Sequence, residues 1–150
     1  MQNTVSNTTA WFNKAVREPA SKNMHTQLGR HFEEVNEMVM VLVATDFETQ
    51  ILLDIAKSSL NALSKHLKRM DNVIRVRPED RQEFLDAICD QIVTGAGCAH
   101  MVDMDVVGGL NEVNRSNFSR FNALVDPIFD PNMKVMRGPD YTKPDLSPFV

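Results

Sequence analysis

Apolar residues recur at helical spacing along most of the chain. In the segment 47–69 they follow one another three or four positions apart, which places them on one face of an α-helix. The alternation typical of a strand is confined to the short segment 73–76. The pattern predicts helices over Val5–Arg17, Thr26–Thr45, Phe47–Arg69, Pro78–Met101 and Val106–Phe121.

Prolines interrupt this pattern near the C-terminus. Five of the seven prolines fall in the last 24 residues, and proline cannot continue a helix because it lacks the amide hydrogen. We therefore expect one all-α domain over residues 1–150, an antiparallel bundle of about five helices. Its C-terminal part, 126–150, is expected to be an irregular, proline-rich tail.

Length and charge narrow the class of protein. The 150 residues carry a formal net charge of −4, and a chain of this size buries roughly 70% of its unfolded surface. No uncharged run approaches the roughly 18 residues of a membrane span, and the N-terminus carries no signal-peptide core. The acidic balance disfavours a nucleic-acid polymer as partner. We expect a cytoplasmic protein with no membrane contact, whose Cys89 and Cys98 are free thiols packed as small hydrophobes.

Three acids stand out within the expected helix Thr26–Thr45. Glu33, Glu34 and Glu37 fall within one sector of roughly 100° on a helix. A solvated face usually places lysine or arginine one turn further on, but here the apolar run Met38–Ala44 follows, which we expect to be a buried helix segment. Acids that border a core are costly unless something neutralises them.

A second acidic pair, Asp86 and Asp90, lies one turn apart on the expected helix Pro78–Met101. Carboxylates from two helices of a bundle can bind Mg²⁺, which prefers oxygen ligands, with Mn²⁺ as a substitute. Solvated acids are an equally good explanation of the pattern. A di-iron centre needs Glu-x-x-His pairs, and none of the four histidines follows a glutamate by three positions. Asp86 and Asp90 border an apolar stripe made of Leu85, Ile88, Ile92, Ala96 and Ala99.

The segment 111–121 is rich in hydrogen-bond donors. Arg115 and Arg120 can bind phosphate oxygens with forked geometry, and Asn114 and Asn117 are spaced to contact a base or sugar edge. A fraying helix end is the alternative, since Asn and Ser are poor helix formers. Together with the acids, these residues predict a nucleoside polyphosphate site.

Several stretches resemble a known family. The sequences HFEEVNEM, LDAICDQIVTGAG, EVNRSNFSRF and GPDYTKPDL, with FNKAV near the start, are similar to the all-α NTP pyrophosphohydrolase superfamily. That superfamily includes MazG-like, dimeric dUTPase and phosphoribosyl-ATP pyrophosphohydrolase branches. The closer match is to the phosphoribosyl-ATP pyrophosphohydrolase-like proteins of phages and prophages. The similar stretches cover most of residues 11–149.

The resemblance implies an enzyme that hydrolyses a nucleoside triphosphate between the α and β phosphates, with Mg²⁺, to a nucleotide monophosphate and pyrophosphate. Carried over, Glu34 and Glu37 are metal ligands, and Glu33 is either a ligand or the base that orients water. The resemblance also implies a homodimer or homotetramer.

The second acidic motif departs from the family pattern, in which a glutamate lies three residues before the final aspartate. Asp90 matches that aspartate, but Ala87 occupies the glutamate position. Asp86 on the same helix face is one replacement for the missing ligand. The pair Glu83 and Asp86 fits the motif literally, one turn earlier.

The resemblance also assigns substrate contacts. The residues that match the family's phosphate or nucleotide segment, with weaker candidates in the tail, are Asn114, Arg115, Asn117 and Arg120, then Lys134, Tyr141 and Lys143. The base and sugar of the substrate stay open. So do a non-catalytic nucleotide- or protein-binding relative of the same fold and a purely structural helical protein.

Overall fold

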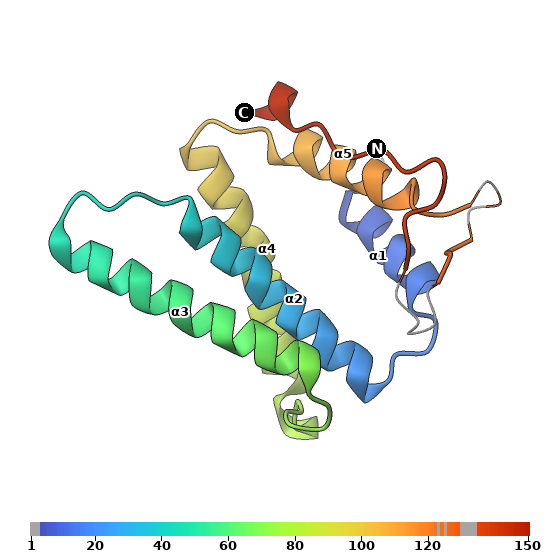
Figure 1. Ribbon diagram of the computed structural model, residues 1–150, viewed down its shortest axis with the longest axis horizontal. Coiled ribbons are helices and arrows are strands. Elements are labelled where there is room, and N and C mark those ends of the chain that lie inside the picture. The colour runs from blue at the N-terminus through green and yellow to red at the C-terminus, as the bar shows by residue number, and fades with distance from the viewer. Residues whose placement is uncertain (1–3, 123, 125, 130–134) are drawn as a thin grey trace. The chain divides into compact units, whose positions relative to one another are not determined.

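The computed structural model describes residues 4–122, 124, 126–129 and 135–150, and these residues are mainly helical (Figure 1). The single bridge between Phe129 and Val135 is the one extended pairing within these ranges. The all-α prediction is therefore confirmed. The described helices are α1 (Thr4–Ala15), α2 (Ser21–Met40), α3 (Phe47–Arg69), α4 (Arg81–Met101) and α5 (Val106–Phe118), with the 3₁₀ turns η1 (Pro78–Asp80) and η2 (Ser147–Phe149).

The chain forms two compact units. One comprises residues 18–77 and contains α2 and α3, and the other comprises residues 1–17 and 78–150 and contains α1, α4, α5 and the tail. The single domain over 1–150 stays a prediction. No helix within the described part of the chain has the length and apolar character that a membrane span requires.

In the first unit, α2 and α3 lie side by side as an antiparallel hairpin (Figure 1). The ammonium group of Lys22, near the start of α2, donates to the carbonyl of Met70, just after α3, over 2.9 Å. Further along α2, the Glu33 carboxylate lies 2.7 Å from Nζ of Lys68. Contacts between the start of one helix and the end of the other fix the antiparallel sense.

A glycine sets how closely the two helices approach. A Cβ atom added to Gly29 would lie 2.9 Å from the carbonyl oxygen of Ser64 and 2.8 Å from Cγ of Lys68. Ser64 and Leu67 on the facing side of α3 are buried. The tight crossing at Gly29 therefore holds the middle of α2, and with it the acidic turn that follows, against α3.

Both ends of α2 differ from the prediction, and a local contact sets where the helix starts. The helix begins at Ser21 rather than Thr26, where the Ala20 amide donates to the Asn23 side chain over 2.9 Å. It ends at Met40, and Asp46 caps α3 by accepting from the Thr49 amide over 2.8 Å. The prediction of a buried helical segment over 38–44 is wrong, because residues 41–46 link the two helices and Val43 is 89% exposed.

A buried histidine anchors the segment that leaves α3. His25 is fully buried, and its Nε2 accepts from the amides of Val73 over 3.0 Å and Ile74 over 3.2 Å. Its Nδ1 lies 2.9 Å from the carbonyl oxygen of Ser21. Because Nε2 must accept, the ring is neutral with the proton on Nδ1. These bonds hold the alternating segment 73–76 as a loop.

In the second unit, α1 packs on α5. The Asn114 side chain donates to the carbonyl of Thr4 over 3.0 Å, and Nε1 of Trp11 donates to the carbonyl of Asn117 over 2.9 Å. The Trp11 ring stacks on Phe121 with centroids 5.8 Å apart. Thr4 at the start of α1 contacts Asn114, and Trp11 further along α1 contacts residues further along the chain, Asn117 and Phe121. This pair is therefore parallel, unlike the antiparallel packing expected for the bundle.

Helix α4 has no buried residue. Leu85 is 63% exposed and Ile92 is 51% exposed, so the apolar stripe expected to face a core is uncovered. Cys89 and Cys98 are free, as predicted, but exposed rather than packed as small hydrophobes. That part of the prediction is wrong, because α4 has no buried residue and both cysteines lie on its exposed surface.

Candidate metal and nucleotide site

The three glutamates of α2 differ in their partners. Glu33 is held by Lys68 from α3, with 2.7 Å between carboxylate and ammonium. Glu34 and Glu37 are exposed, and neither lies within ion-pair distance of a cation in the described part of the chain. The α2–α3 contact thus fixes one carboxylate and leaves two available to a ligand.

The surroundings of Glu34 disfavour its charged form. Its pKa is raised above the ordinary value, first because partial burial disfavours the charged form, and second because the charges of Glu37 and Glu33 repel it. Arg30 and His31 oppose this effect without cancelling it. A cation bound at this turn would relieve the repulsion.

The acids of α4 lie in the other unit. An open hollow of about 640 Å³ runs along the start of this helix. It includes Glu83 and Asp86, the pair that fits the family motif literally, whereas Asp90 does not line it. Asp86 and Asp90 are both exposed. The centre predicted to combine α2 and α4 joins residues of different units and stays a prediction. The residues that line the hollow are Glu79, Gln82, Glu83, Leu85, Asp86 and Cys89.

The donor chemistry of α2 fits Mg²⁺. No group of three His, Cys, Asp or Glu side chains is gathered tightly enough to enclose a metal within residues 4–122, 124, 126–129 and 135–150. Mg²⁺ does not require such a cage, because it usually binds through one or two carboxylates and completes its shell with water and substrate phosphates. Glu34 and Glu37 supply two carboxylates of this kind.

Two of the predicted nucleotide contacts already have partners inside the protein. Asn114 is buried, where it donates to Thr4 and accepts from the Thr8 hydroxyl over 3.0 Å. The carbonyl of Asn117 receives the Trp11 indole. These bonds join α1 to α5. The side-chain bonds of Asn114 explain why an asparagine occupies that position of the helix, whereas the Asn117 bond uses only the backbone carbonyl.

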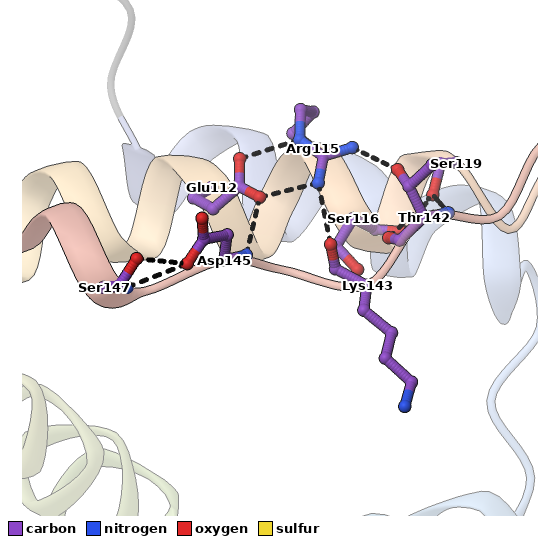
Figure 2. A network of polar contacts seen from close by, with 8 residues as sticks. All are labelled: Glu112, Arg115, Ser116, Ser119, Thr142, Lys143, Asp145 and Ser147. Atoms are coloured by element: carbon purple, nitrogen blue, oxygen red, sulfur yellow. Dashed lines mark hydrogen bonds and ion pairs between the residues drawn. The ribbon is translucent and has the colours of Figure 1, made fainter.

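Arg115 is the centre of a polar network between α5 and the tail (Figure 2). It forms a forked pair with Glu112, with Nε to Oε2 at 2.7 Å and the second bond at 2.6 Å. It also donates to the Thr142 hydroxyl and to the Lys143 carbonyl. Its donors are thus engaged by protein groups.

Glu112 completes this network. Its carboxylate accepts from the Asp145 amide over 3.0 Å as well as from Arg115. The hydrogen bond from Arg115, followed by that amide, lowers the pKa of Glu112 to about 2. The Ser119 hydroxyl receives the amide of Thr142 over 3.0 Å. These hydrogen bonds consequently hold residues 142–145 along α5.

A second hollow lies where α1 meets α5. It has a volume of about 510 Å³, within the range of roughly 300–1,000 Å³ usual for ligand pockets. Asn114 and Arg115 were predicted as nucleotide contacts, whereas Asn7, Asn111 and Phe118 were not. The spacing of residues 111, 114 and 118 on one helix face is a signal that could have found two of them. The hollow is lined by Asn7, Asn111, Asn114, Arg115 and Phe118.

The remaining predicted contacts lie near the end of α5 and in the tail. The Arg120 guanidinium carbon is 5.3 Å from the centre of the Tyr141 ring. Lys143 contributes its carbonyl to Arg115, and its side chain extends away from the network in Figure 2. Lys134 lies outside the described residues.

Comparison with known proteins adds no relative. No family model, curated protein or solved structure matches this chain.

Proposed function

We propose that the protein is an Mg²⁺-dependent nucleoside triphosphate pyrophosphohydrolase that cleaves between the α and β phosphates. The observation that carries the proposal is the acidic turn of α2. There Glu34 and Glu37 stand without an ion-pair partner among the described residues, and mutual repulsion contributes to the raised pKa of Glu34. Such a turn favours a bound divalent cation over a merely structural role.

In this proposal Glu34 and Glu37 hold the metal. When bound, Mg²⁺ offsets the negative charge of the phosphates and lowers the pKa of a coordinated water. Glu33, positioned by its 2.7 Å bond to Lys68, orients the attacking water for in-line displacement. No covalent intermediate forms.

The α1–α5 hollow is the proposed place for the nucleoside. Its amides can pair with the edge of a base or a sugar, and Phe118 offers an aromatic surface. Asn7 and Asn111 carry this role, because Asn114 is already bonded to α1.

We propose a homodimer or homotetramer as the working form. Helix α4 exposes Leu85, Ile92 and Val93 together, and contiguous exposed apolar surface of this kind commonly marks an interface.

One feature favours a second function. Asn114 and Arg115, two of the residues matched to the nucleotide segment, are used to build the fold. A relative that binds nucleotide or protein without catalysis would carry this pattern, and it would lack turnover.

A pyrophosphate-release assay separates the two functions. Canonical and modified NTPs and dNTPs are supplied with Mg²⁺ or Mn²⁺, and an EDTA reaction is the blank. Release that needs the metal and is lost in Glu37→Gln supports hydrolysis. Glu48→Gln is the matched control, because Glu48 is an exposed acid at the start of α3. No release from the folded protein with any nucleotide would favour the binding-only relative.

A further inference from the structure

The turn formed by residues 138–141 is held by backbone hydrogen bonds against the residues that follow α5. The Gly138 amide donates to the carbonyl of Arg120 over 3.0 Å, and the Tyr141 amide donates to the carbonyl of Gly138 over 3.1 Å. A Cβ atom at Gly138 would lie 2.8 Å from the Arg120 carbonyl oxygen. Only glycine fits there, so Tyr141 is placed beside Arg120 by the backbone.

Two arginines meet at the Tyr141 ring. The guanidinium carbon of Arg120 is 5.3 Å from the ring centre and that of Arg137 is 4.8 Å from it. The two cations are therefore at most about 10 Å apart, within the Debye length of roughly 10 Å at moderate salt. The ring attracts each cation, but it does not offset their charge.

These arginines differ from Arg115 in their partners. Arg115 is forked onto Glu112, whereas neither Arg120 nor Arg137 has a carboxylate within 4.0 Å among the described residues. Nε of Arg120 is buried and has no hydrogen-bond partner within the described part of the chain. Since more than about 90% of buried donors are paired in folded proteins, an unpaired nitrogen of this kind sets Arg120 apart from Arg115.

We propose that Arg120 and Arg137, aligned by Tyr141, form a binding site for a phosphoryl anion carrying more than one negative charge. Guanidinium groups bind phosphate oxygens in pairs of parallel hydrogen bonds, and two such groups at most about 10 Å apart complement the charge of a diphosphate. This inference rests on the proposed function, in which it assigns the β and γ phosphates of the substrate. It adds Arg137 as a contact that the sequence did not indicate, and it makes Arg120, which follows α5, rather than Arg115 the phosphate-binding arginine.

The single tyrosine of the chain allows a direct test. Inorganic pyrophosphate is titrated into the full-length protein in EDTA, and the ring signals of Tyr141 are followed by proton NMR. We expect saturable shifts in the wild type and at least ten-fold weaker binding in Arg137→Gln. Arg81→Gln, which removes the same charge at an exposed position of the same unit, should change the affinity less than two-fold.

The outcomes distinguish this inference from the proposed function. Arg137→Gln that binds pyrophosphate as tightly as the wild type overturns the site, even if Mg²⁺-dependent hydrolysis is intact. Absence of shifts at 10 mM pyrophosphate in the wild type overturns it as well. Selective loss of binding in Arg137→Gln supports the site, even if no nucleotide is hydrolysed. Displacement by a single-stranded oligonucleotide at concentrations far below pyrophosphate would instead identify a nucleic-acid surface and overturn the diphosphate assignment.

Discussion

Two glutamates, each within an α-helix, have pKa values shifted in opposite directions. Glu112 on α5 accepts a forked pair from Arg115 and the amide of Asp145, and its pKa falls to about 2. Glu34 on α2 lies beside Glu33 and Glu37, and its pKa rises. The residue type and the secondary structure are the same, so the difference comes from the partial burial of Glu34 and from the neighbouring groups of each carboxylate.

This contrast separates a structural carboxylate from one available to a ligand. Glu112 has its charge satisfied within the protein and holds the tail on α5. The acids of α2 leave negative charge unsatisfied at a turn that tight packing against α3 keeps in place. A divalent cation is therefore expected to bind the acids of α2 and not Glu112.

The largest effect is expected for activity. Glu37→Gln removes a charge from the proposed metal site, and we expect pyrophosphate release to fall by about 10³-fold, because the electrostatic stabilisation of the phosphates is lost. Initial rates at saturating Mg²⁺ measure this loss. Glu48→Gln should keep its rate within a factor of two, and an equal loss in both variants would contradict a role specific to α2.

The second-largest effect is expected for the close packing of α2 against α3 at Gly29. Gly29→Ala forces a methyl group against Ser64 and Lys68, and overpacking of this kind costs about 1–3 kcal/mol. The corresponding fall in Tm is about 3–9 °C for a chain of this size, measured by circular dichroism. Gly95→Ala in α4 is the control, because a Cβ there meets nothing within 4 Å. It should leave the Tm unchanged or raise it slightly.

The tail should detach in acid. The pKa of Glu112 is about 2 in the folded protein against an ordinary value of 4.5. The lowered pKa therefore stabilises the fold above about pH 4.5, and this contribution is lost as the pH falls toward 2. The Asp145 amide, which donates to Glu112, should lose hydrogen-exchange protection over that range. Glu112→Gln should show weakened protection already at pH 7. Unchanged protection in both experiments would contradict the role of Glu112 in holding the tail on α5.

The smallest effect concerns Glu34 without metal. A raised pKa means that the charged form is disfavoured in the folded state, so the ionisation of Glu34 lowers stability as the pH rises from about 4.5 through its folded pKa. Glu34→Gln should therefore raise the Tm at pH 7 in EDTA by about 1–2 °C, a surface-sized effect. The gain should vanish near pH 4, where the wild-type carboxyl is protonated.

Hydrophobic spacing was sufficient to predict the helices, and α3 has the predicted ends (Phe47–Arg69). The start of α2 was misplaced because it depends on a single contact from Asn23, and its end because the apolar run 38–44 continues beyond the helix. Spacing within α2 also identified the crowded acids. Spacing alone did not reveal that Glu112 and Arg115 bind each other and the tail. The tail residues that contact them, Lys143 and Asp145, lie outside the helix and carry no helical repeat. Arg137 was missed since its partner, Tyr141, is reached through a turn rather than a helical repeat.

The central claim is that the acids of α2, and not Glu112, bind a divalent cation. Substoichiometric Mn²⁺ added to ¹⁵N-labelled protein tests this directly, because the paramagnetic ion broadens amide signals close to it. We predict that residues 33–38 lose their signals while Glu112 and Asp145 keep theirs, and that Glu34→Gln with Glu37→Gln restores the lost signals. Uniform broadening, or broadening centred on Glu112, would contradict the account.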